Sequence, residues 1–178
     1  MIFEQTPLDG AYIIGLDLRT DDRGFFARAF CVHEFAAHGL ETQFVQSNLS
    51  HNVRAGLVRG MHFQRGADAE VKLVRCVSGA IYDVIVDMRK DSRTYLRWFG
   101  VELNAENGRS IYVPRGFAHG YQSLTPGATV HYMVSAPYAP EAEGGLRHDD
   151  PAIGIHWPQT VTDVSVKDAA WPLMERRA

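Results

Sequence analysis

The sequence predicts a mainly β protein in which short strands form a sandwich or barrel, with a few short helices. Apolar residues alternate over short runs, and clusters of Gly, Asp, Asn and Pro separate these runs. Helical periodicity is confined to residues 32–38 and 166–174. No long Pro/Ser-rich linker or fixed-period repeat divides the chain, so we expect a single domain over residues 1–178.

The expected strands are the segments in which apolar side chains recur with a period of two. They cover residues 12–18, 44–46, 57–63, 71–77, 80–88, 98–103, 110–113 and 129–134.

Composition narrows the class of protein. The 178 residues, 46% of them apolar, can bury one sizeable core. The net charge of -3, with both signs mixed along the chain, gives no reason to expect a nucleic acid or a membrane as partner. Cys31 and Cys76 are far apart and form neither a disulfide framework nor a zinc motif. No leader pattern and no apolar run of about 20 residues occur, so a cytoplasmic location is expected.

Two glycine-anchored segments, 56–64 and 108–119, place His62 and His119 where one barrel would aim them into a single pocket. The second segment carries a proline, a glycine and a histidine in the spacing of the second cupin motif. The first keeps the Gly-to-His spacing of that fold but has Gln64 where a second metal-binding histidine would stand. We therefore expect a cupin-type jelly roll whose pocket is built for substrate rather than for metal.

Strand alternation tests which side chains can reach this pocket. Tyr132 shares a face with the valines two residues before and after it, and can point inward. Lys72 also lies on an apolar face, where a charged group needs a partner or an anionic ligand. Alternation places Arg59 opposite His62, unless Gly60 introduces a bulge or a bend.

Nine segments together resemble the nucleotide-sugar 3,5-epimerase family typified by dTDP-4-dehydrorhamnose 3,5-epimerase, from about residue 21 to about residue 172. They follow one another in the order of that family. The segments are 22–26, 46–50, 59–64, 72–75, 83–89, 114–120, 138–141, 149–151 and 167–168.

The resemblance implies an isomerase of deoxysugar biosynthesis, built as a homodimer and needing no cofactor and no metal. It would invert C3, C5 or both, beside the C4 ketone of a nucleoside-diphosphate 4-keto-6-deoxy sugar. By the same match His62 is the base, Asp168 fixes its tautomer, Tyr132 is the acid on the opposite face and Lys72 stabilises the enolate.

The resemblance also implies a set of substrate contacts. Arg23 and Arg59 would clamp the diphosphate, and Tyr138 would stack against the sugar. Arg28 stands at a nucleotide-contacting position where the family has a glutamate; because a guanidinium only donates, the base recognised stays open. Departures at Pro137 and Asn52 suggest an altered sugar pocket. The other expected contacts are Gln46, Ser47, Asn48, His119, Glu143 and Lys167.

Other interpretations remain open from the residues alone. His62 and His119 could be structural, Tyr132 a core aromatic and Asp168 a helix cap. A metal-dependent cupin would use His62, Gln64, Glu70 and His119, although an amide oxygen is a weak ligand beside imidazole. A single-carbon 3-epimerase, a ketoisomerase and a sugar-nucleotide binding module without catalysis are the remaining alternatives.

Overall fold

The computed structural model describes residues 1–174, which form short strands and very little helix. The strands are β1 (Ile2–Gln5), β2 (Tyr12–Gly15), β3 (Arg19–Asp21), β4 (Gly24–Phe26), β5 (Gln46–Asn52), β6 (Leu57–Gln64), β7 (Lys72–Ser78), β8 (Ala80–Asp87), β9 (Trp98–Asn104), β10 (Arg109–Val113), β11 (Phe117–Ser123), β12 (Ala128–Val134), β13 (Glu143–Gly145) and β14 (Asp163–Val164). The helices are α1 (Val32–Ala37) and α2 (Val166–Ala169), with single 3-10 turns η1 (Gly66–Asp68) and η2 (Pro140–Ala142).

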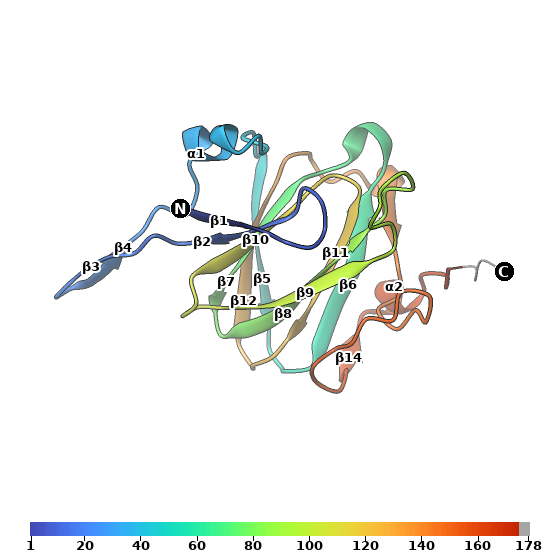
Figure 1. The fold of residues 1–178 in the computed structure, drawn as a ribbon. Helices are drawn as coiled ribbons and strands as arrows, with labels where there is room; N and C mark the ends of the chain where they lie inside the picture. The colour runs from blue at the N-terminus through green and yellow to red at the C-terminus, as the bar shows by residue number, and fades with distance from the viewer. Residues whose placement is uncertain (175–178) are drawn as a thin grey trace.

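Two sheets face each other and form the body of the molecule (Figure 1). One has the strand order β1-β2-β10-β7-β12-β5, and the other has the order β13-β6-β11-β8-β9, with β14 added in parallel beside β6. The hairpin of β3 and β4 projects away from both sheets, at the left of Figure 1. The mainly β prediction is therefore confirmed.

The core lies between the two sheets, where their inward apolar side chains meet. Val74, Ile85, Leu103 and Ile111 belong to this cluster and are almost completely excluded from solvent. Burying such a side chain stabilises a fold by about 1.5–3 kcal/mol. Tyr132 packs against the same cluster, so the core forms the floor beneath a candidate site residue.

The expected elements differ from the observed ones in several places, and β1, β3, β4, β13 and β14 were not expected. The strand expected at 44–46 is β5, which starts at Gln46 and continues to Asn52; its polar side chains hide the alternation. β11 was not expected, because every one of its side chains is buried and shows no polar face. The helix expected at 166–174 ends at Ala169, since Pro172 disfavours helix at Trp171.

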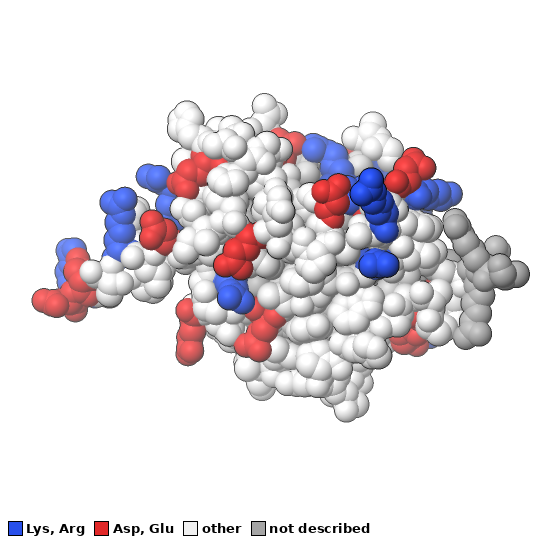
Figure 2. Space-filling view, viewed as in Figure 1, with Lys and Arg blue, Asp and Glu red and all other residues white. Residues whose placement is uncertain are grey.

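The surface agrees with the near-neutral charge of the sequence. On the face shown in Figure 2, acidic and basic side chains are interspersed. Within residues 1–174, no helix is long and apolar enough to cross a membrane.

Candidate active site

A β-bulge in β6 brings Arg59 and His62 to the same side of the strand. The register with β11 shifts between the partners of these two residues, so an extra residue of β6 is accommodated. Gly60 makes the bulge possible: its φ is +115°, and a Cβ there would lie 2.6 Å from the Cα of Gly120. The bulge that would allow Arg59 and His62 to share one opening is confirmed.

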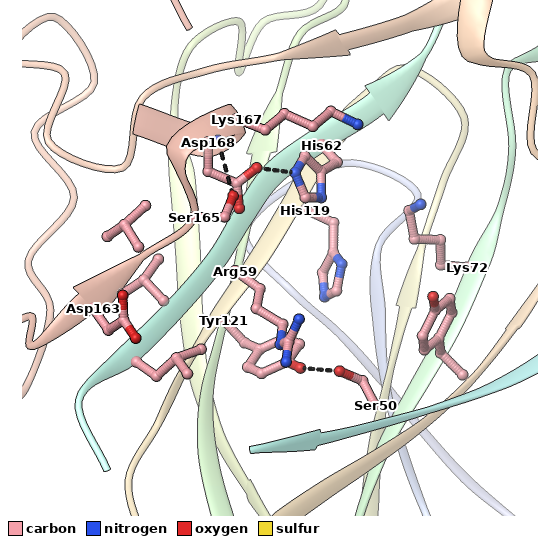
Figure 3. A pocket seen from close by; sticks show the side chains of 14 residues that line it. Ser50, Arg59, His62, Lys72, His119, Tyr121, Asp163, Ser165, Lys167 and Asp168 are labelled. Carbon is pink, nitrogen blue, oxygen red and sulfur yellow. Dashed lines mark hydrogen bonds and ion pairs between the residues drawn. The ribbon is translucent and has the colours of Figure 1, made fainter. Parts of the chain in front are cut away.

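His62 is paired with a carboxylate from the far end of the chain. Its Nε2 lies 2.6 Å from Oδ1 of Asp168 on α2 (Figure 3). The other carboxylate oxygen accepts the N–H of Gly60 at 3.1 Å. Ser165 caps α2 by accepting the N–H of Asp168, and the preceding β14 pairs with β6. These contacts fix the carboxylate relative to the imidazole.

The charge state of Asp168 determines the tautomer of His62. Burial opposes ionisation, but hydrogen bonds from His62 and from the N–H of Gly60 outweigh it, so the pKa of Asp168 is lowered. A carboxylate only accepts hydrogen bonds, so Nε2 of His62 carries the proton. Nδ1 then holds the lone pair, and the imidazole can act as a base.

Alternation along β5, β7 and β12 directs several polar side chains toward the same interior space. Tyr132 of β12 lies opposite Asn48 of β5, and the next inward position, Val134, lies between Gln46 of β5 and Lys72 of β7. Tyr132 and Lys72 both line the cavity described below. Their predicted inward orientation is confirmed.

The acid and cation candidates have environments that suit those roles. The ammonium of Lys72 donates to Glu70, which supplies the partner that a largely buried lysine requires. Burial raises the pKa of Tyr132, and Tyr121 and Glu70 raise it further. The Tyr132 hydroxyl therefore stays protonated near neutral pH and has a proton to give.

Arg59 is oriented by uncharged groups. Its Nε donates to Oδ1 of Asn52 at 2.9 Å, and its Nη2 donates to the carbonyl of His51 at 3.3 Å. Asn52 is fully buried and donates in turn to the carbonyl of Ala128. Among the ion pairs of residues 1–174, none involves Arg59. No acidic side chain in this described range therefore pairs with the guanidinium, and the N–H groups that these contacts leave unused can bind an anionic ligand.

His119 is hydrogen-bonded to a buried aspartate. Its Nε2 lies 2.9 Å from Oδ2 of Asp83, on the neighbouring strand β8. Burial raises the pKa of Asp83, and His119 partly offsets that rise. His119 lines the cavity beside His62, as the two glycine-anchored segments predicted.

These side chains surround one cavity of about 420 Å³, with a second of about 230 Å³ beside it. His62, Lys72 and Tyr132 line both. Figure 3 shows His62, His119, Lys72 and Arg59 around the first space. The first cavity is also lined by Ser50, Leu57, Val58, Arg59, His119, Tyr121, Asp163, Val164, Ser165, Lys167 and Asp168, and the second by Gln46, Asn48, Phe63, Gln64, Glu70, Val134, Tyr138 and Glu143.

Three predicted substrate contacts form a network, in which Tyr138 and Glu143 line the second cavity and Lys167 lines the first. The hydroxyl of Tyr138 donates to Oε2 of Glu143 at 3.0 Å. Lys167 donates to both carboxylate oxygens of Glu143 at 2.7 and 2.6 Å, and its ammonium lies 5.9 Å from the centre of the Tyr138 ring. The phenol ring is largely exposed and available for stacking.

Three predicted contacts lie outside both cavities. Ser47 is placed on the outer face of β5, where its hydroxyl lies 2.8 Å from Nε2 of His131. Its neighbours Gln46 and Asn48 face inward and line the second cavity, and the substrate contact expected of Ser47 stays a prediction. Arg23 pairs with Asp21 in the projecting hairpin, and Arg28 pairs with Glu34. In this chain neither arginine reaches the cavities.

Several cavity residues were not identified from sequence. Ser50 and Tyr121 are hydrogen-bonded to each other at 2.9 Å, and Asp163 and Ser165 belong to the segment that leads into α2. The inward alternation of β5 would have indicated Ser50, if β5 had been recognised as a strand. No local pattern indicates Asp163, whose position depends on the pairing of β14 with β6.

The side chains that a metal-dependent cupin would use are engaged in other contacts. Gln64 is bonded to backbone groups, and Glu70 pairs with Lys72. His62 and His119 are each bonded to an aspartate through Nε2. Within residues 1–174, no group of three or more His, Cys, Asp or Glu side chains is placed to hold a metal ion.

The fold and the cavity define a jelly-roll protein with a His–Asp pair, a tyrosine and a lysine around one cavity. The family model for dTDP-4-dehydrorhamnose 3,5-epimerase matches residues 5–176. The chain belongs to this family.

Individual relatives match the chain over most of its length. A dTDP-4-dehydrorhamnose 3,5-epimerase of Methanothermobacter thermautotrophicus is 47% identical over 97% of this chain and 95% of its own. A structure of the Bacillus anthracis enzyme with TDP and PPi bound has a TM-score of 0.94 and 40% identity, covering 97% of this chain and 99% of that one. The Legionella pneumophila enzyme in complex with dTDP-4-keto-L-rhamnose has a TM-score of 0.90 and 36% identity, covering 97% and 92%. The predicted cupin-type fold and the isomerase class are confirmed.

Proposed function

We propose that the protein epimerises C3 and C5 of a dTDP-linked 4-keto-6-deoxy sugar, without a cofactor. The observation that supports this proposal most strongly is the His62–Asp168 pair at 2.6 Å, in a cavity that Tyr132 and Lys72 also line. The names of the relatives supply the thymidine nucleotide and the sugar. The alternatives of a ketoisomerase, a metal-dependent cupin and a binding module have no comparable support.

Proton abstraction is the first half of the reaction. A carbon beside a ketone loses its proton readily, because the electron pair moves onto the C4 oxygen and forms an enolate. Nδ1 of His62 accepts the proton, and the imidazolium is stabilised by the ionised Asp168 at Nε2. The ammonium of Lys72, whose side chain is largely buried, stabilises the enolate oxygen.

Reprotonation from the other face completes the inversion. Tyr132 gives its hydroxyl proton to the carbon, the enolate electrons return to that carbon and the ketone re-forms. Solvent then removes the proton from His62 and restores the one on Tyr132, so no net oxidation or reduction occurs. Repeating the cycle at the second carbon requires no further group.

Substrate binding is assigned to the charged and aromatic groups at the edge of the site. Arg59 lies where the diphosphate would neutralise it, Lys167 can contact the substrate from its ion pair with Glu143, and Tyr138 offers a ring for stacking. His119 and the β5 side chains Gln46 and Asn48 supply hydrogen bonds to the sugar nucleotide.

Deuterium incorporation tests this function. Nucleoside-diphosphate 4-keto-6-deoxy hexoses, in thymidine and uridine forms, are incubated with the protein in deuterated water, with and without a chelator. We expect NMR to show deuterium at C3 and C5 with inverted configuration, faster turnover of the thymidine form and no effect of the chelator. Deuterium at C3 alone would identify a single-carbon epimerase, and no exchange with any sugar would contradict the proposal.

We also propose that the protein is a cytoplasmic homodimer. Apolar side chains are exposed on the outer face of the edge strand β5 and just beside it, with Leu49 72% and Val53 66% exposed. Phe25 and Phe26 are similarly exposed on the projecting hairpin (Figure 1). Burying these surfaces in a second copy removes apolar area from water. The predicted substrate contacts of Arg23 and Arg28 would then be made in the partner's cavity, because neither residue lines its own.

Leu49→Asp is expected to dissociate this dimer, because two carboxylates would be buried at a two-fold interface. Light scattering on the eluted protein should give a mass near 40 kDa for the wild type, about twice the 19.9 kDa of one chain, and near 20 kDa for the variant. Leu173→Asp, at an exposed leucine away from β5, serves as the control. A monomeric wild type would refute the dimer.

A further inference from the structure

Gln64 is buried in the candidate site, but the proton-transfer chemistry does not use it. It is the last residue of β6, two positions after His62, and it is 5% exposed. Its amide makes three hydrogen bonds, all with backbone groups. Nε2 donates to the carbonyls of Asp68 at 2.9 Å and Pro137 at 3.1 Å, and Oε1 accepts the N–H of Ala139 at 2.7 Å.

Two of these hydrogen bonds lie on either side of Tyr138. The carbonyl before it and the N–H after it are both held by Gln64, and the N–H of Tyr138 itself donates to Oε1 of Gln46 at 3.2 Å. Glutamines from both sheets therefore fix three successive residues of the loop. The hydroxyl of Tyr138 donates to Glu143 and its ring lies near Lys167, while the backbone held by the two glutamines sets where the ring begins.

The third hydrogen bond connects Gln64 to the strand that carries the cation. Asp68 ends η1, which leads through Glu70 to Lys72 at the start of β7. One amide thus joins the strand of the base, the approach to Lys72 and the loop of the stacking ring. Both amide hydrogens and the amide oxygen are used in this way.

We propose that Gln64 is a positioning residue, which holds Tyr138 at the wall of the cavity against the bound sugar nucleotide. At the position where a metal-dependent cupin places a second imidazole, this chain uses an amide to organise substrate binding. The inference rests on the proposed epimerase function. It predicts that loss of Gln64 acts chiefly through Tyr138.

The central test is a double-mutant cycle of Gln64→Met and Tyr138→Ala. Methionine preserves length and apolar volume but removes all three hydrogen bonds. We expect Gln64→Met to raise KM about 10-fold or more, because misplacing a binding group by about 1 Å can cost up to about 100-fold. We expect kcat to fall by less than about 5-fold, since His62 and Asp168 are not displaced. In the Tyr138→Ala background the same substitution should have little further effect on KM.

Two further variants separate positioning from general stability. Gln64→Glu retains the acceptor for Ala139 but loses both donors, so its KM should fall between wild type and Gln64→Met. It also provides the measurement if the methionine variant does not fold. Gln122→Met is the matched control. The amide of Gln122 is also buried and bonds the carbonyl and the N–H of one residue, Gln159, but it lies outside both cavities. It should lower the melting temperature comparably and leave KM unchanged.

The KM values of these variants decide whether Gln64 positions Tyr138. A wild-type KM in Gln64→Met, an equal rise in the Tyr138→Ala background, or an equal rise in Gln122→Met would overturn the positioning role. Failure of the wild-type protein to turn over any keto-sugar nucleotide would instead overturn the proposed function. The two failures are therefore distinguishable.

Discussion

Replacement of His62 by asparagine is expected to abolish both epimerisation and the exchange of carbon-bound hydrogen with deuterated water. General acid–base groups contribute about 10²–10⁴-fold to turnover, and the aspartate paired with His62 has a lowered pKa that keeps it ionised. Asparagine keeps a polar group beside Asp168 but has no lone pair basic enough to take the proton. Mass spectrometry of the sugar nucleotide after incubation in deuterated water measures the loss.

The binding site should survive this substitution. Arg59 and Lys167 keep their own contacts, so affinity for dTDP should change by less than about threefold, as calorimetry can measure. His33→Asn, at an exposed histidine on α1, is the control and should behave as the wild type. Deuterium exchange at the wild-type rate in His62→Asn would show that another group is the base.

Replacement of Tyr132 by phenylalanine is expected to separate exchange from inversion. His62 can still remove the proton and return a deuteron from solvent to the same face, so deuterium enters the sugar while its configuration is retained. Inversion should fall about 10²–10⁴-fold, because phenylalanine has no proton to deliver to the opposite face. The raised pKa of Tyr132 keeps the wild-type hydroxyl protonated throughout the assay range.

Comparing deuterium content with configuration by NMR distinguishes the two proton-transfer roles. Equal loss of exchange and inversion in Tyr132→Phe would contradict its assignment as the acid alone. Tyr112→Phe provides a matched control, because Tyr112 is buried, bonds the N–H of Glu41 and lines neither cavity. It should change neither measurement.

Strand alternation predicted the parts of the site that lie on regular, half-apolar strands. It oriented Tyr132 and Lys72 correctly because valines mark the inward face of their strands. It gave no guidance for β5, whose sequence is polar on both faces, so it could not show that Gln46 and Asn48 face the second cavity while Ser47 faces away. The sequence could show that a bulge at Gly60 was needed, but not that it forms. The bulge depends on the close approach of Gly60 to Gly120, which is a tertiary contact.

Local sequence patterns could not predict contacts between residues that are far apart along the chain. Asp168 was assigned through family resemblance, because nothing near position 168 indicates an imidazole 106 positions earlier. The locations of Arg23 and Arg28 depend on a hairpin that leaves the body of the chain, which composition and periodicity do not reveal. The sequence showed that Gln64 stands where a cupin has a metal-binding histidine. It could not show the hydrogen bonds of Gln64 to backbone groups, which depend on how separate segments pack together.

The distance along the chain between His62 and Asp168 also bears on when the enzyme becomes active. On the ribosome, β6 emerges long before α2, and domains of this topology gain their non-local contacts late. A nascent chain can therefore complete most of both sheets while its imidazole is still without the carboxylate that fixes its tautomer. The His62–Asp168 pair can form only after α2, the last helix within residues 1–174, has been synthesised, so a chain that ends just before α2 lacks this pair.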